Sequence, residues 1–178
     1  MTGSSVGAGP ALLVMGVAGC GKSRIGAAVA ARLGARFIEG DAFHPAANIT
    51  KMQAGIPLDD AHRAGWLDRL GIELAAATAG GGRAVLACSA LKRAYRDRLR
   101  AAVPGLAIVF LDLPEEVAAA RVAARPGHFM PASLVASQVA TLERPDGEPR
   151  MLRLDATGTA DDLVAAAARW AGPLPGRA

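Results

Sequence analysis

Short apolar runs alternate along the chain with stretches in which apolar residues recur at helical spacing. Runs typical of buried strands occupy residues 11–15, 36–39, 83–88, 107–111 and 151–155. Helical spacing is found in residues 25–33, 61–78, 90–101, 114–124, 132–142 and 160–171. Strands that alternate with helices predict parallel strands joined by right-handed crossovers and covered on both faces. We therefore predict an α/β fold, a three-layer α/β/α domain with a five-stranded parallel sheet.

Three segments interrupt this pattern. Residues 42–60 are polar, and Pro45 and Pro57 within them allow at most one short helix. Glycines at 80–82 end the long helix that follows, and residues 125–131 (RPGHFMP) form a second break.

The length and composition favour one domain. The chain has 178 residues, of which 52% are hydrophobic, enough for one core. We expect residues 1–10, rich in Gly and Ser, to be a disordered tail, and residues 11–178 to be a single domain. Because no signal peptide and no apolar run of about 20 residues is found, we expect a cytoplasmic protein without a membrane partner.

Residues 16–23 read GVAGCGKS and match the phosphate-loop (P-loop) pattern GxxxxGKS. A predicted strand precedes them and a predicted helix follows, as that loop requires. The pattern predicts that ATP binds to Gly16, Val17, Ala18, Gly19, Cys20, Gly21, Lys22 and Ser23. In this position Lys22 reaches the β- and γ-phosphates and the Ser23 hydroxyl holds Mg²⁺.

Polar residues follow the predicted strands at their carboxyl ends, where ligands bind in such sheets. They are Glu39, Asp41, Ser89, Asp112 and Asp155, and we expect them to surround one crevice with the P-loop. In phosphoryl transfer to an alcohol, one carboxylate holds the metal and another orients or deprotonates the acceptor hydroxyl. Glu39 and Asp41 are the candidates for these roles. The alternative for Asp41 is a turn residue without chemistry.

The net charge of +4 and the pI of about 9.7 raise the question of nucleic acid. The chain has no long basic run and no interleaved aromatic residues, so we expect a small anionic substrate and no nucleic acid. Cys20 and Cys88 have no CxxC spacing, so neither zinc nor a structural disulfide is indicated. Cys20 is a candidate for oxidation, although a small residue that fits the turn is the favoured interpretation.

Residues 40–67, GDAFHPAANITKMQAGIPLDDAHRAGWL, resemble the acceptor-binding segment of the gluconokinases, small kinases of the shikimate kinase-like group. Further segments carry the resemblance: MGVAGCGKS, CSALKRAYRDRLR (88–100) and RPGHFMPASLVASQVATLERP (125–145). Together they span almost the whole chain beyond the first ten residues. The resemblance implies a P-loop kinase that converts ATP and D-gluconate into 6-phospho-D-gluconate and ADP, and a homodimer, since dimers are common in the family.

Two positions depart from the family pattern. His62 stands where an acidic residue is usual, and Gly65 where proline is usual. We expect both to loosen the start of the helix that contains them.

An aldonate carries a carboxylate and a row of hydroxyls, so its pocket needs cations at one end and mixed donors and acceptors elsewhere. The segment 41–79 and the helix near residue 92 supply candidate substrate contacts: Asp41, His44, Asn48, Lys51, Arg63, Lys92 and Arg96. Lys92 and Arg96 are four residues apart and so share a helix face. For each cation singly, a solvated surface charge is an equally good interpretation. Trp66 is assigned to the core.

Residues 121–132 correspond, by the resemblance, to a lid that closes over ATP and excludes water. Arg121, Arg125 and His128 flank its break. We assign Arg121 and Arg125 to ATP, Arg125 also to the charge on the transferred phosphoryl group, and His128 to the substrate.

Two other functions fit the P-loop. One is a kinase for a different small acceptor, such as shikimate or a nucleoside monophosphate. The other is a non-catalytic ATP-binding module, which would bind nucleotide without transferring phosphate.

Overall fold

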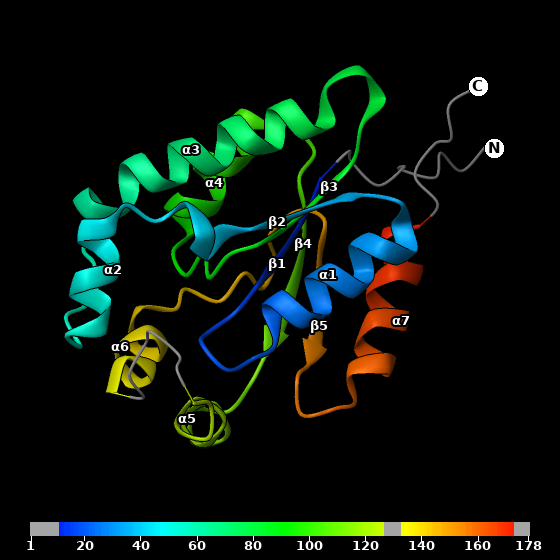
Figure 1. Cartoon of the computed structure of the whole chain (residues 1–178). Helices are drawn as coiled ribbons and strands as arrows, with labels where there is room; N and C mark the ends of the chain where they lie inside the picture. Colours follow the sequence, from blue (N-terminus) through cyan, green and yellow to red (C-terminus); the bar gives the residue numbers. More distant parts are fainter. Residues whose placement is uncertain (1–10, 127–132, 173–178) are drawn as a thin grey trace.

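Five parallel strands form the central sheet of the computed structural model, which describes residues 11–126 and 133–172 (Figure 1). They are β1 (Ala11–Met15), β2 (Arg36–Glu39), β3 (Ala84–Ala87), β4 (Ala107–Asp112) and β5 (Met151–Asp155). Their order across the sheet is β2-β3-β1-β4-β5. The predicted α/β fold with a five-stranded parallel sheet is therefore confirmed.

The helices follow the predicted pattern with small shifts at their ends. They are α1 (Lys22–Leu33), α2 (Ala46–Gln53), α3 (Asp60–Thr78), α4 (Arg93–Ala102), α5 (Glu115–Ala123), α6 (Ser133–Thr141) and α7 (Ala160–Ala171). Two 3₁₀ turns cover Gly40–Phe43 and Ala79–Gly81. α4 begins three residues later than predicted because Ala90 has φ +43° and Lys92 is extended, so neither belongs to a helix.

Alternate residues of β1 enter two separate cores, because successive side chains of a strand point to opposite faces. Leu12 and Val14 pack with residues of α1, α5 and α7, whereas Leu13 and Met15 pack with residues of α3 and α4. Figure 1 shows the same arrangement, with α3 and α4 on one side of the sheet and α1 and α7 on the other. The central strand is thus buried on both faces, as its continuous apolar run predicts.

The start of α3 is capped by hydrogen bonds in which His62 takes part. Asp59 is the N-cap residue, and its Oδ1 accepts the N–H of His62 at 2.8 Å. The same oxygen lies 2.5 Å from His62 Nδ1. His62 is thus part of the helix cap, and the expectation that His62 and Gly65 loosen this helix start stays a prediction.

Candidate active site

One pocket opens at the carboxyl ends of β1, β2 and β3, where the P-loop, the turn after β2 and the turn after β3 meet. The P-loop contributes Lys22 and Ser23, the turn after β2 contributes Asp41, and the turn after β3 contributes Ser89. The complete lining is Ala18, Gly19, Gly21, Lys22, Ser23, Arg24, Asp41, His44, Met52, Arg63, Ser89, Arg125 and Gln138. Residues that are distant in the sequence thus form one site, because parallel strands end at the same edge.

The P-loop keeps its shape through glycines in conformations that other residues rarely adopt. Gly19 and Gly21 have φ +83° and +94°. A Cβ at Gly19 would lie 2.8 Å from the carbonyl oxygen of Ala118, and one at Gly16 would lie 2.7 Å from that of Leu111. Lys22 Nζ donates a hydrogen bond to the Val17 carbonyl at 3.0 Å and so lies over the loop. Gly16, Val17 and Cys20 shape the loop without lining the pocket.

Both cysteines are buried. Cys20 is 2% exposed and its Sγ lies 4.0 Å from Lys22 Nζ. Burial raises the pKa of the Cys88 thiol to about 12. This burial agrees with the favoured interpretation of Cys20 as a small residue that fits the turn.

Asp41 is held beside the P-loop by a tightly packed turn. A Cβ at the preceding Gly40 would lie 2.5 Å from the Ala87 carbonyl oxygen, so only glycine permits this approach of β2 to β3. The Gly40 carbonyl accepts a hydrogen bond from Trp66 Nε1 at 2.8 Å. Trp66 is 2% exposed, so its assignment to the core is confirmed. The Asp41 side chain remains 36% exposed and faces the pocket.

His44 lies under Asp41 and stacks on Trp66, with ring centroids 4.0 Å apart. Its Nε2 is 3.9 Å from Asp41 Oδ1. Burial lowers the pKa of His44 to about 4, although the carboxylate of Asp41 acts in the opposite direction. The ring is therefore neutral near pH 7. In the described part of the chain, its Nδ1 is buried without a hydrogen-bond partner.

Arg63 is the acceptor-segment cation that lines this pocket. Its Nε donates to the Leu58 carbonyl at 3.2 Å, and its Cζ lies 5.7 Å from the centroid of the Tyr95 ring. Within the described residues, no ion pair between Arg63 and a carboxylate is found. Its charge is thus available to an anion in the pocket.

Asn48 and Lys51 lie outside the pocket lining and join α2 to α3. Asn48, which is 4% exposed, donates to the His62 carbonyl at 3.0 Å. Lys51 Nζ lies 2.5 Å from His62 Nε2. Both residues therefore connect helices of the acceptor segment. They were predicted to contact the substrate, but the structure does not bring them to the pocket.

Lys92 also lies elsewhere, in a shallow depression with Asp60, Tyr95 and Thr141. Its Nζ is 2.7 Å from Asp60 Oδ1, which also accepts a hydrogen bond from the Tyr95 hydroxyl. The hydrogen bond from Lys92 lowers the pKa of Asp60. Lys92 precedes α4 as its N-cap, so it shares no helix face with Arg96.

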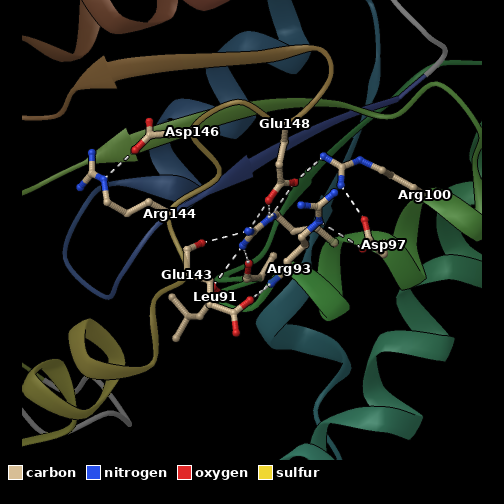
Figure 2. A network of polar contacts seen from close by, with 10 residues as sticks. Leu91, Arg93, Asp97, Arg100, Glu143, Arg144, Asp146 and Glu148 are labelled. Carbon is tan, nitrogen blue, oxygen red and sulfur yellow. Dashed lines mark hydrogen bonds and ion pairs between the residues drawn. The ribbon is translucent and has the colours of Figure 1, made fainter.

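The prediction that Arg96 binds substrate is wrong. Arg96 is 0% exposed, and its guanidinium pairs with Glu148 and donates to the carbonyls of Ala90, Leu91 and Glu143. Figure 2 labels Leu91, Glu143 and Glu148 of this network, and it shows that Glu148 also pairs with Arg100. All of the hydrogen-bonding capacity that would serve a substrate is used within the protein.

The crevice includes fewer strand-end carboxylates than predicted. Asp112 pairs with Arg144 and Arg153, and the hydrogen bond from Arg144 lowers its pKa. Asp155 accepts hydrogen bonds from the backbone and hydroxyl of Thr157 in the turn after β5. Neither lines the pocket, because β4 and β5 end on the side of the sheet away from Asp41. Glu39 is half-buried at the end of β2, next to the lining.

The residues predicted for the lid are only partly described. Arg125 is exposed and lines the pocket. Arg121 lies between the P-loop and the turn after β5, donating to the Gly19 carbonyl at 3.4 Å and to the Ala156 carbonyl at 3.1 Å. His128 lies outside the described residues, as do residues 1–10, for which a tail was predicted.

The sequence reasoning missed three lining residues: Arg24, Met52 and Gln138. Arg24 follows the P-loop serine and therefore belongs to the first turn of α1. Gln138 is a polar residue on an otherwise apolar face of α6, next to the buried Leu134 and Val135. A buried amide at such a position was the available signal.

The described residues gather no group of three or more His, Cys, Asp or Glu side chains that would hold a metal by themselves. The Ser23 hydroxyl is exposed and lines the pocket, whereas the Glu39 carboxylate is half-buried at the end of β2; both are hard oxygen donors of the kind that Mg²⁺ accepts. A search for membrane-spanning helices in the described ranges found none of sufficient length and apolarity.

Comparison with known proteins places these features among kinases. Residues 12–145 match the family model described as an AAA domain. The gluconokinase of Gluconobacter oxydans (strain 621H) is 48% identical over 143 residues, which cover 80% of this chain and 80% of that protein.

Two solved structures are similar over nearly their whole length. A gluconokinase from Sinorhizobium meliloti 1021 has a TM-score of 0.82 and 46% identity, covering 93% of each chain. A sugar kinase from Janibacter sp. HTCC2649 has a TM-score of 0.88 and 42% identity, covering 93% of this chain and 95% of that one.

Proposed function

Because the chain belongs to the gluconokinase family, we propose that the pocket between the P-loop and Asp41 is where it phosphorylates gluconate with ATP. The reaction is the ATP-dependent phosphorylation of gluconate, and the product we assign is 6-phospho-D-gluconate, with ADP. The observation that carries the assignment of the site is that Lys22 and Ser23 line the same pocket as Asp41 and Arg63. Phosphate-binding groups thus face a carboxylate and a free cation.

On the nucleotide side, the backbone N–H groups of residues 19–23 and the N-terminus of α1 attract the phosphates of ATP. Within the described residues, the Val17 carbonyl is the oxygen partner of Lys22, and we propose that Lys22 exchanges it for the β- and γ-phosphates. We assign Arg121, which lies between the P-loop and residue 156, to the remainder of the nucleotide.

We propose that the Ser23 hydroxyl would hold Mg²⁺ directly and that Glu39 would hold it through water. Two protein oxygen donors would agree with the small number of protein ligands that this ion usually has. When bound, Mg²⁺ neutralises charge on the phosphates.

On the acceptor side, Asp41 orients the C6 hydroxyl and accepts its proton. The hydroxyl oxygen forms a bond to the γ-phosphorus while the bond from that phosphorus to the β-phosphate oxygen breaks, and ADP leaves with the electron pair. His44 beside Asp41 is neutral, so it adds no positive charge that would make the Asp41 carboxylate a weaker proton acceptor.

Arg63 is the cation we assign to the gluconate carboxylate. Lys92 is neutralised by Asp60 and Arg96 by Glu148, whereas in the described part of the chain Arg63 contacts a carbonyl and an aromatic ring and no carboxylate. A guanidinium that pairs with a carboxylate in two hydrogen bonds gives geometric selectivity as well as affinity.

Arg125 lines the pocket from the end of α5 and is placed to stabilise the charge on the transferred phosphoryl group. We assign His128 to the same closing segment, with a contact to the substrate, and we propose that closure excludes water from ATP. A cytoplasmic homodimer completes the proposal, and sedimentation of the purified protein tests the dimer.

The deciding experiment measures ADP production with Mg·ATP and a panel of gluconate, other sugar acids, shikimate and nucleoside monophosphates. Stimulation by gluconate alone, with 6-phosphogluconate as product, is the expected result. Stimulation by shikimate or a nucleoside monophosphate instead would assign a different acceptor. Nucleotide binding without stimulation by any acceptor would indicate the non-catalytic module.

A further inference from the structure

Gln138 on α6 is hydrogen-bonded to the P-loop, although 120 residues separate the two in the sequence. Its Oε1 accepts the backbone N–H of Ala18 at 2.7 Å. The side chain is 8% exposed, and both residues line the active-site pocket. A short hydrogen bond at a buried position holds its partners firmly, because losing it would leave a polar group without compensation.

Core packing does not account for an amide at this position. The neighbouring residues on the buried face of α6 are apolar: Val135 packs in the core that contains Ala18, and Leu134 packs against Met52 and Leu58 of the acceptor segment. An apolar side chain of the same size would fill this space without the cost of burying an amide. The hydrogen bond to the loop is a contact that an apolar side chain could not make.

Ala18 is the point of the loop at which such a contact has most effect. It lies between Gly16 and Gly19, whose backbone conformations are accessible mainly to glycine. Glycine loses more conformational entropy than other residues when it becomes ordered. Inside the loop, the hydrogen bond from Cys20 N to Val17 O is long, at 3.3 Å. Fixing the Ala18 peptide from outside thus orients the residues on either side of it.

We propose that Gln138 is a positioning residue that holds the P-loop in its phosphate-binding shape. It acts through the Ala18 peptide, and it sets the affinity for nucleotide. This inference rests on the proposed function for the identity of the acceptor, but its effect on nucleotide binding is independent of gluconate.

The test compares Gln138→Met, which keeps the size but removes the acceptor oxygen, with Leu134→Ala, which disturbs the same helix and leaves the hydrogen bond in place. Calorimetric titration with ADP should show a roughly two- to tenfold weaker affinity for Gln138→Met, the range for one net hydrogen bond. The KM for ATP should rise by a similar factor while the KM for gluconate is unchanged. Leu134→Ala should bind ADP like the wild type, although it unfolds at a lower temperature.

ADP affinity that is unchanged in Gln138→Met, or reduced equally in Leu134→Ala, would overturn the proposal. A second measurement uses the wild type alone: the Ala18 amide should exchange with solvent slowly in the nucleotide-free protein, followed by NMR. Exchange at the rate of an unprotected amide would overturn the proposal as well. If the acceptor panel shows no activity with gluconate, both binding measurements still decide the role of Gln138.

Discussion

Arg96 and Glu148 form an ion pair that is almost completely shielded from water. Arg96 Nη2 lies 2.5 Å from Glu148 Oε1, and the two side chains are 0% and 5% exposed. Burial by itself raises the pKa of Glu148, but the hydrogen bonds from Arg96 and Arg100 outweigh it and the net shift is downward. The pair joins α4 to the segment that follows α6, and it holds the turn after β3 through the carbonyls of Ala90 and Leu91.

Replacing Arg96 should therefore destabilise the protein strongly. In Arg96→Met, Glu148 would be left with a single partner, and we expect a loss of about 3 kcal/mol in the free energy of unfolding. The control is Arg98→Met on the same helix, whose pair with Asp68 is about half-exposed, and for which we expect a loss below about 1 kcal/mol. Urea denaturation measures both, and similar losses in the two variants would contradict the structural role of Arg96.

Asp41→Asn should lower kcat by roughly 10² or more and leave the affinity for ATP nearly unchanged, because the amide cannot accept the hydroxyl proton. Steady-state kinetics and ADP titration measure the two effects. Asp60→Asn is the matched control, since Asp60 belongs to the same segment but pairs with Lys92 outside the pocket. A fully active Asp41→Asn enzyme would remove Asp41 from the mechanism.

Arg63→Met keeps the apolar stem of the side chain and removes its charge. We expect the KM for gluconate to rise by roughly 10- to 100-fold, as for the loss of a charge-assisted hydrogen-bonded pair, with little change in the KM for ATP. Lys92→Met should change the KM for gluconate much less, because Asp60 already neutralises Lys92. A larger rise in the KM for gluconate in Lys92→Met than in Arg63→Met would instead assign the carboxylate contact to Lys92.

His44 makes stability depend on pH in a defined window. Its pKa is lowered to about 4 in the folded protein, from an ordinary value of 6.5. Between these two pH values the unfolded chain binds a proton at His44 that the folded protein does not bind. Protonation therefore favours the unfolded chain, and the free energy of unfolding decreases as the pH falls from about 6.5 towards 4.

The measurement for His44 is urea denaturation at several pH values in wild type and in His44→Phe, which keeps a ring to stack on Trp66. The carboxylates titrate in both proteins, so the difference between them isolates His44. We expect the variant to lose less stability than the wild type between pH 6.5 and 4. Parallel pH profiles would mean that His44 is protonated in the folded protein at the same pH as in the unfolded chain.

The elements of the fold could be predicted because each depends on local periodicity and on nearby stop signals. The apolar run of β1 and the glycine after α1 are examples, since both reflect the chain within a few residues. The P-loop and Asp41 could be located for a related reason: parallel strands end at one edge, whatever their order.

The role of Arg96 could not be predicted, because spacing assigns a residue to a helix face but does not say what covers that face. Its partner Glu148 is 52 residues away and belongs to a segment without regular structure. Asp112 shows the same limit, since its position at a strand end was predicted correctly while its partners, Arg144 and Arg153, come from later elements. Gln138 could be noticed as an amide on an apolar helix face, but its hydrogen bond to the Ala18 backbone N–H, 120 residues away, could not be predicted from any side-chain pattern.

The order of the strands also has a consequence for how the protein folds. β1 lies between β3 and β4, with Leu12 paired to Val85 on one side and to Ala107 on the other. Such pairings require the closure of long loops. The entropy of loop closure is lost before the stabilising contacts form, and this slows folding. The P-loop is attached to the end of β1 and is hydrogen-bonded to Gln138, which follows β4 in the chain. We therefore expect the nucleotide site to mature after the sheet has closed around β1 and α6 has packed on the loop. The gain of ATP binding would then report this closure, during synthesis and in refolding experiments alike.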